Sequence, residues 1–124
     1  MILVDSSAWI EHMMNGDRAD SLSEYVNADS ILVPTSVLYE VYKFARRELG
    51  EDAALAMAAR FRKFGLVPLD ETLALEAAEA SLRYRLAFAD AVVYATAQYY
   101  GATLVTLDRH FADLADVVYL GDAA

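Results

Sequence analysis

The residues of this sequence best suited to chemistry are four acids, Asp5, Glu40, Asp90 and Asp108. Each stands at or near the start of a segment with a helical pattern, and Asp5 and Asp108 also end short apolar segments typical of buried strands. Clustered carboxylates repel one another unless a cation lies among them, and oxygen ligands favour hard cations such as Mg²⁺ or Mn²⁺. Such an ion activates water and balances the charge of a phosphodiester under in-line attack. The four acids therefore indicate metal-dependent phosphoryl chemistry.

Short apolar strands alternate with helical segments along the whole chain. We expect strands at residues 2–4, 31–33, 66–69, 103–106 and 117–120, and helices at 7–15, 17–27, 36–49, 52–64, 72–86, 90–100 and 109–114. This alternation predicts an α/β fold with a parallel sheet covered on both faces. Ligands bind beyond the carboxyl ends of such strands, which is where Asp5 and Asp108 are expected. The length of 124 residues predicts one domain spanning 1–124.

Each acid also has a purely structural interpretation. Asp5, Asp90 and Asp108 could be helix N-caps, and Glu40 could be a solvated acid paired with Lys43 three residues later. The segment that follows Asp90 is apolar almost all round, which is typical of a helix buried inside a domain. A carboxylate carried inward by that helix needs a cation or hydrogen bonds to offset its desolvation. A cluster explains all four positions together, whereas capping and solvation explain them one at a time.

The composition limits the class of protein. No cysteine is present, and two histidines make a zinc site improbable. The apolar runs are far shorter than the roughly 18 residues that span a bilayer, and no signal peptide is apparent, so we expect a cytoplasmic protein that binds no membrane. The net charge of −9 opposes nucleic-acid binding unless acids hold cations or basic residues gather locally.

The basic and imidazole side chains leave two interpretations open. The segment that carries Glu40 has three basic residues near its end, Lys43, Arg46 and Arg47. These side chains would either interact favourably with the C-terminus of the helix or contact RNA phosphates. His110 could be a general base, but a solvated surface histidine is the more ordinary case.

Four segments, taken in order, resemble the motifs of the PIN-domain family, and specifically the VapC-like toxins of toxin–antitoxin pairs. They are ILVDSS at 2–7, PTSVLYEV at 34–41, ADAVVYATA at 89–97 and LVTLDRHF at 104–111. Each motif is short, but together they span essentially the whole chain. The resemblance implies a PIN-like three-layer α/β/α sandwich with a central, mostly parallel sheet of about five strands.

The resemblance also implies a function. The implied function is a Mg²⁺- or Mn²⁺-dependent endoribonuclease that hydrolyses RNA phosphodiester bonds. The resemblance further implies a homodimer that is inhibited by a VapB-like antitoxin. By motif position, the catalytic acids and metal ligands are Asp5, Glu40, Asp90 and Asp108, and the accessory hydroxyls are Ser6 and Thr106. Two alternatives remain: a PIN-like module that binds proteins without catalysis, and a PIN nuclease of RNA processing that has no antitoxin.

Overall fold

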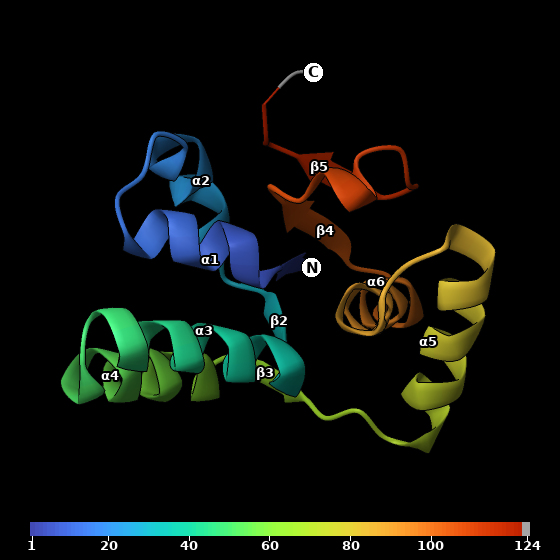
Figure 1. Cartoon of the computed structure of the whole chain (residues 1–124), viewed down its shortest axis with the longest axis horizontal. Helices are drawn as coiled ribbons and strands as arrows, with labels where there is room; N and C mark the ends of the chain where they lie inside the picture. The colour runs from blue at the N-terminus through green and yellow to red at the C-terminus, as the bar shows by residue number, and fades with distance from the viewer. Residues whose placement is uncertain (123–124) are drawn as a thin grey trace.

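A five-stranded parallel sheet forms the centre of the protein. The computed structural model describes residues 1–122, and Figure 1 shows the arrangement of their helices and strands. The strands are β1 (Ile2–Val4), β2 (Ile31–Pro34), β3 (Gly65–Val67), β4 (Thr103–Thr106) and β5 (Val117–Tyr119), in the spatial order β3-β2-β1-β4-β5. The helices are α1 (Ser6–Met13), α2 (Ala19–Val26), α3 (Thr35–Glu48), α4 (Glu51–Arg62), α5 (Glu71–Tyr84) and α6 (Phe88–Tyr100), with a 3₁₀ turn η1 (Arg109–Phe111). The expected α/β/α sandwich is confirmed.

The sheet order contains a switch point between β1 and β4, where the chain changes direction. From β1 the chain moves to β2 and β3 on one side, and then crosses through α5 and α6 to β4 on the other side of β1. Strands β1 and β4 are hydrogen-bonded neighbours, with Ile2 opposite Thr103 and Val4 opposite Val105. In open parallel sheets, ligands bind at this kind of switch point, beyond the carboxyl ends of the strands. Asp5 and Asp108 follow those two strands.

Helix α6 is the most deeply buried helix. Every residue from Ala91 to Ala97 is buried, because its side chains face the sheet, α5 and α3. This confirms the burial expected from its nearly uninterrupted apolar sequence. The helix begins at Phe88 with Ala87 as N-cap, so Asp90 lies in the first turn rather than in the capping position. Gly101 ends the helix in the left-handed region, with φ of 67°, which glycine adopts without strain.

Helix ends were less predictable than helix positions. Helix α2 begins at Ala19 with Arg18 as N-cap, so the expectation that Asp17 caps this helix is wrong. The Glu11 side chain accepts a hydrogen bond from the Arg18 backbone NH at 2.9 Å, which is a contact from another helix.

None of the helices within residues 1–122 combines the length and apolar composition that a bilayer crossing requires.

Candidate active site

Asp5 is a buried carboxylate at the junction of β1 and α1. It caps α1, because Oδ1 accepts hydrogen bonds from the backbone NH of Ser7 at 2.7 Å and of Ala8 at 3.4 Å, and from the Ser7 hydroxyl at 2.5 Å. Its Oδ2 accepts a hydrogen bond from the Thr106 hydroxyl at 2.5 Å. Burial raises the pKa of Asp5, and these hydrogen bonds offset part of that rise. The capping interpretation is therefore correct for Asp5, yet it does not explain the pairing with a residue on β4.

A hydroxyl network holds the ends of β1 and β4 together. Thr106 Oγ1 accepts a hydrogen bond from the Asp108 backbone NH at 2.9 Å, and Ser7 Oγ accepts one from the Leu107 NH at 3.1 Å. Asp108 in turn caps η1, since its Oδ1 accepts from the His110 NH at 2.9 Å. Thr106 was expected to be an accessory hydroxyl, whereas the contact between Ser7 and Asp5 was not foreseen.

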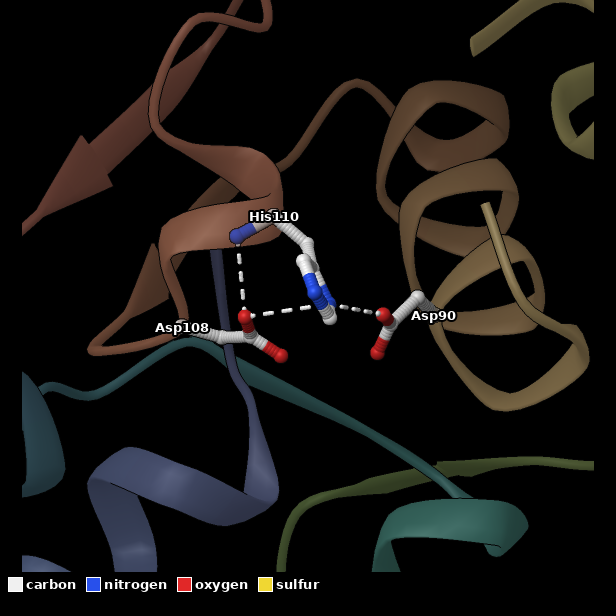
Figure 2. Close-up of side chains that lie close together, drawn as sticks. All are labelled: Asp90, Asp108 and His110. Atoms are coloured by element: carbon white, nitrogen blue, oxygen red, sulfur yellow. Dashed lines mark hydrogen bonds and ion pairs between the residues drawn. The ribbon is translucent and has the colours of Figure 1, made fainter. Parts of the chain in front are cut away.

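Next to this network, three further side chains lie close together: Asp90, Asp108 and His110. Figure 2 shows the His110 imidazole, carried by η1, between the Asp108 carboxylate and the Asp90 carboxylate from α6. His110 Nδ1 lies 3.0 Å from Asp90 Oδ2 and 3.3 Å from Asp108 Oδ1. One potential ligand atom from each of the three residues lies within 4.8 Å of the other two. The hydrogen bond with Asp90, followed by the charges of Asp108 and Asp90, raises the pKa of His110.

Glu40 completes the group of acids from the side of α3. Burial raises its pKa above the ordinary glutamate value, the Ser6 side chain lowers it by hydrogen bonding, and the charges of Asp5 and Asp90 raise it further. Glu40 therefore lies in the electrostatic field of acids from β1 and α6. Ser6, the other expected accessory hydroxyl, interacts with Glu40, while its neighbour Ser7 holds Asp5.

This cluster carries an excess of negative charge. Within residues 1–122, no lysine or arginine nitrogen lies within 4.0 Å of a carboxylate oxygen of the four acids, and His110 pairs with two of them, Asp90 and Asp108. Carboxylate oxygens gathered in this way fit a hard divalent cation, which would relieve their mutual repulsion. The donor set therefore suits the Mg²⁺ or Mn²⁺ predicted from the sequence.

Glu40→Gln should stabilise the metal-free protein at neutral pH. The substitution removes a partly buried charge that Asp5 and Asp90 repel, and we expect the free energy of unfolding to rise by roughly 0.5–1 kcal/mol. Because the pKa of Glu40 is raised in the folded state, its charge destabilises the protein above that pKa and the penalty disappears as the pH falls through it. Urea unfolding of both proteins in EDTA at pH 7.5 and pH 4 measures this effect. An equal difference at both pH values would contradict it.

The three residues predicted to contact RNA border two different grooves along α3. Lys43 and Arg47 border a groove of about 260 Å³ that also contains Ser6, Glu40 and Tyr39. Arg46 lines a neighbouring apolar groove together with Leu38, Tyr42 and Ala58, and Arg47 and Lys43 reach its rim. Lys43 and Arg47 thus adjoin Glu40, while Arg46 lies 3.9 Å from Glu51 at the start of α4.

His110 is the residue at this site that sequence reasoning undervalued. Its position two residues after Asp108 offered one signal, since a tight turn after a strand keeps both side chains near the same edge of the sheet. Only the folded chain places Asp90 on the opposite side of the ring. His12, in contrast, lies on α1 with its Nε2 3.5 Å from the Ser23 hydroxyl.

Comparisons with known proteins agree with this fold. The model of the PIN domain family matches residues 2–117. A toxin–antitoxin complex from Klebsiella pneumoniae contains a similar chain, with a TM-score of 0.81 and 20% identity over 95% of this chain and 96% of that one. The sarcin–ricin-loop-cleaving toxin VapC20 of Mycobacterium tuberculosis gives a TM-score of 0.77 and 21% identity over 98% and 100%.

A third structure, VapBC2 of Rickettsia felis bound to a fragment of its promoter DNA, gives a TM-score of 0.70 and 14% identity over 98% of each chain. No curated protein sequence matches this chain significantly. At these identities the structural likeness establishes the fold, and the family match covers nearly all of the sequence.

Proposed function

Because this chain belongs to the PIN domain family, we propose that it is a metal-dependent endoribonuclease and the toxin of a VapBC-type toxin–antitoxin pair. The observation that carries the proposal is that Asp90 and Asp108 meet at His110, while Thr106 joins Asp5 to Asp108. Glu40 lies near enough for the charges of Asp5 and Asp90 to raise its pKa. The similar toxin structures, one described as cleaving the sarcin–ricin loop, support RNA as the substrate.

The four acids have distinct parts in the proposed reaction. Asp90 and Asp108 would hold the ion, with Asp5 fixed beside them by Thr106 and Ser7. A bound Mg²⁺ or Mn²⁺ supplies charge stabilisation of the phosphodiester and lowers the pKa of the attacking water. Glu40, whose raised pKa suits a base, accepts the proton of that water at a carboxylate oxygen. The water oxygen bonds to phosphorus and the bond to the 3′ oxygen breaks. That oxygen takes a proton from solvent, so the products carry a 5′-phosphate and a 3′-hydroxyl.

An RNase assay tests this function directly. The purified protein should cleave a structured RNA in Mg²⁺ or Mn²⁺, lose activity in EDTA and regain it when either ion is restored, leaving 5′-phosphate ends. Cleavage that persists in EDTA would contradict the metal-dependent mechanism. Absence of cleavage with transfer, ribosomal and messenger RNA in both ions would favour a protein-binding module instead.

We propose that Lys43 and Arg47 contact RNA phosphates beside Glu40, with Arg46 contributing from the neighbouring groove. In an acidic protein, these side chains supply the local positive charge that a polyanion needs.

Replacing Lys43 and Arg47 together by glutamine should weaken RNA binding about ten-fold or more in low salt, because two phosphate contacts are lost. It should also reduce the slope of log affinity against log salt by roughly 1 to 2. Fluorescence anisotropy in EDTA buffer measures both the affinity for RNA and its dependence on salt. Arg62→Gln, an exposed change at the end of α4, is the matched control and should bind as wild type. An unchanged salt slope in the double variant would refute the contact.

The proposed antitoxin partner would cover the apolar groove between α3 and α4. This groove of about 640 Å³ is lined by Leu38, Tyr42 and Ala58 and has a basic rim, which suits an amphipathic helix with acidic flanks. The toxin–antitoxin complexes among the similar structures support such a partner. Co-expression with the product of a neighbouring small reading frame should give a complex that co-purifies and suppresses cleavage.

We further propose a homodimer that acts in the cytoplasm, where RNA substrates are found. The outer side of α5 and the start of α6 expose Leu75, Leu82 and Phe88, with exposed fractions of 64%, 80% and 72%. Leu75 and Leu82 are one heptad apart on α5, and large apolar side chains left exposed in this way are typical of a protein interface. Sedimentation velocity of the purified chain should give the mass of two copies, and a monomer at micromolar concentration would contradict this part of the proposal.

A further inference from the structure

We propose that His110 is a ligand of the metal ion and gives the site a preference for Mn²⁺ over Mg²⁺. The inference rests on the proposed function, because it concerns the ion that the acids would hold. It goes beyond that function by assigning a nitrogen ligand to a site otherwise made of carboxylates, and by linking that ligand to the choice of ion.

The distances in the cluster suit one ion shared by three side chains. His110 Nδ1 lies 3.0 Å from Asp90 Oδ2 and 3.3 Å from Asp108 Oδ1. Adjacent ligands of an octahedral ion with bonds of about 2.1 Å are separated by roughly 3 Å. The nitrogen therefore lies about as far from each carboxylate oxygen as one ligand lies from its neighbour around such an ion.

The backbone keeps the imidazole in this place. The NH of His110 donates to Asp108 Oδ1, so the main chain and the ring of His110 both contact the same carboxylate. Nδ1 faces the acids, and the side chain is 72% exposed, so solvent rather than protein surrounds much of the ring. A ring fixed on its Nδ1 side and open to water elsewhere can bind an ion without rearrangement of the core.

The chemistry of imidazole explains the preference. Both ions favour oxygen ligands, but Mn²⁺ is a first-row transition ion and accepts an imidazole nitrogen more readily than Mg²⁺, which retains water in preference to nitrogen. With His110 as a ligand, Mn²⁺ gains a bond that Mg²⁺ gains only weakly. The carboxylates of Asp90 and Asp108 suit both ions, so the histidine changes the ratio of the affinities more than it changes the affinity for Mg²⁺.

A competing explanation makes the opposite prediction. If His110 only neutralises Asp90 and Asp108 as a cation, an incoming metal ion must displace it. Removal of the ring would then tighten the binding of Mn²⁺ and Mg²⁺ alike. The sign of the change in affinity therefore separates a ligand from a competitor.

Calorimetric titration of the RNA-free protein with Mn²⁺ and with Mg²⁺ tests the inference, using wild type, His110→Asn and the matched control His12→Asn. We expect His110→Asn to weaken Mn²⁺ binding about ten-fold and Mg²⁺ binding less than about two-fold. His12→Asn should match wild type. Pulsed electron paramagnetic resonance of bound Mn²⁺ should detect coupling to a directly bonded ¹⁴N nucleus in wild type and in His12→Asn, and this signal should vanish in His110→Asn.

The outcomes distinguish this inference from the proposed function. Equal changes for the two ions, tighter binding of both, or a persistent ¹⁴N signal in His110→Asn would overturn the role of His110 while leaving a carboxylate site and a nuclease in place. Failure of wild type to bind either ion would instead overturn the proposed function together with this inference. Because His110 is exposed, the variant should keep the circular dichroism spectrum of wild type.

Discussion

Asp90→Asn is expected to reduce RNA cleavage by roughly a thousandfold or more without unfolding the protein. Asp90 lies in the first turn of α6 and shares His110 with Asp108, so it stands where the ion is proposed to bind. The amide keeps the shape of the side chain but removes a charge that the ion requires, and loss of charge stabilisation in the transition state has large effects on rate. Single-turnover cleavage in saturating Mn²⁺ measures the loss.

The control for this prediction is Asp113→Asn. Asp113 is an exposed aspartate three residues after His110, and it makes no hydrogen bond or ion pair within the described residues. Its variant should cleave at the wild-type rate, which would show that the effect is specific to the cluster. Thermal unfolding should place both variants within a few degrees of wild type. Full activity of Asp90→Asn would remove the acid cluster from the mechanism.

Thr106→Val is expected to have the second-largest effect, on stability and activity together. The Thr106 hydroxyl donates to buried Asp5 Oδ2 and accepts from the Asp108 NH, so valine leaves both groups without that partner. An unsatisfied buried polar group costs about 1–3 kcal/mol. Because Asp5 and Asp108 also lose their common anchor, we expect cleavage to fall roughly ten- to a hundred-fold.

The pH dependence gives this prediction a second test. The hydrogen bond from Thr106 favours the ionised form of Asp5, so its loss raises the pKa of Asp5 further above the wild-type value. The stability deficit of Thr106→Val is therefore largest at pH values above the pKa of Asp5, and it shrinks as the pH falls through that pKa.

Thr96→Val is the matched control. Thr96 is also a buried threonine, but its hydroxyl donates to the Val92 carbonyl oxygen within α6 and is not part of the cluster. This variant should cleave RNA normally. Urea unfolding at several pH values, combined with the RNase assay, compares the two substitutions. A Thr106 variant as active and as stable as the Thr96 variant would show that the hydroxyl network does not organise the site.

The elements of this fold were largely predictable, because local interactions decide where strands and helices form. Strands β1 and β4 have the expected bounds, and the other elements end within three residues of the expected positions. The apolar sequence after Asp90 predicted the buried helix α6, and side-chain capping predicted Asp5 and Asp108 as helix starts. Asp17 failed as a cap because a contact from Glu11 determines how α2 begins.

The sequence by itself determined which acids could form a site: short strands end just before Asp5 and near Asp108, and a buried helix carries Asp90 in its first turn. Only the tertiary structure decided which groups meet there. Pairing of β1 with β4 joins Asp5 to Thr106, and the packing of α6 places Asp90 against His110. These contacts join residues up to 101 positions apart. They depend on strand order and helix packing, which arise from burial of the whole core rather than from any local pattern.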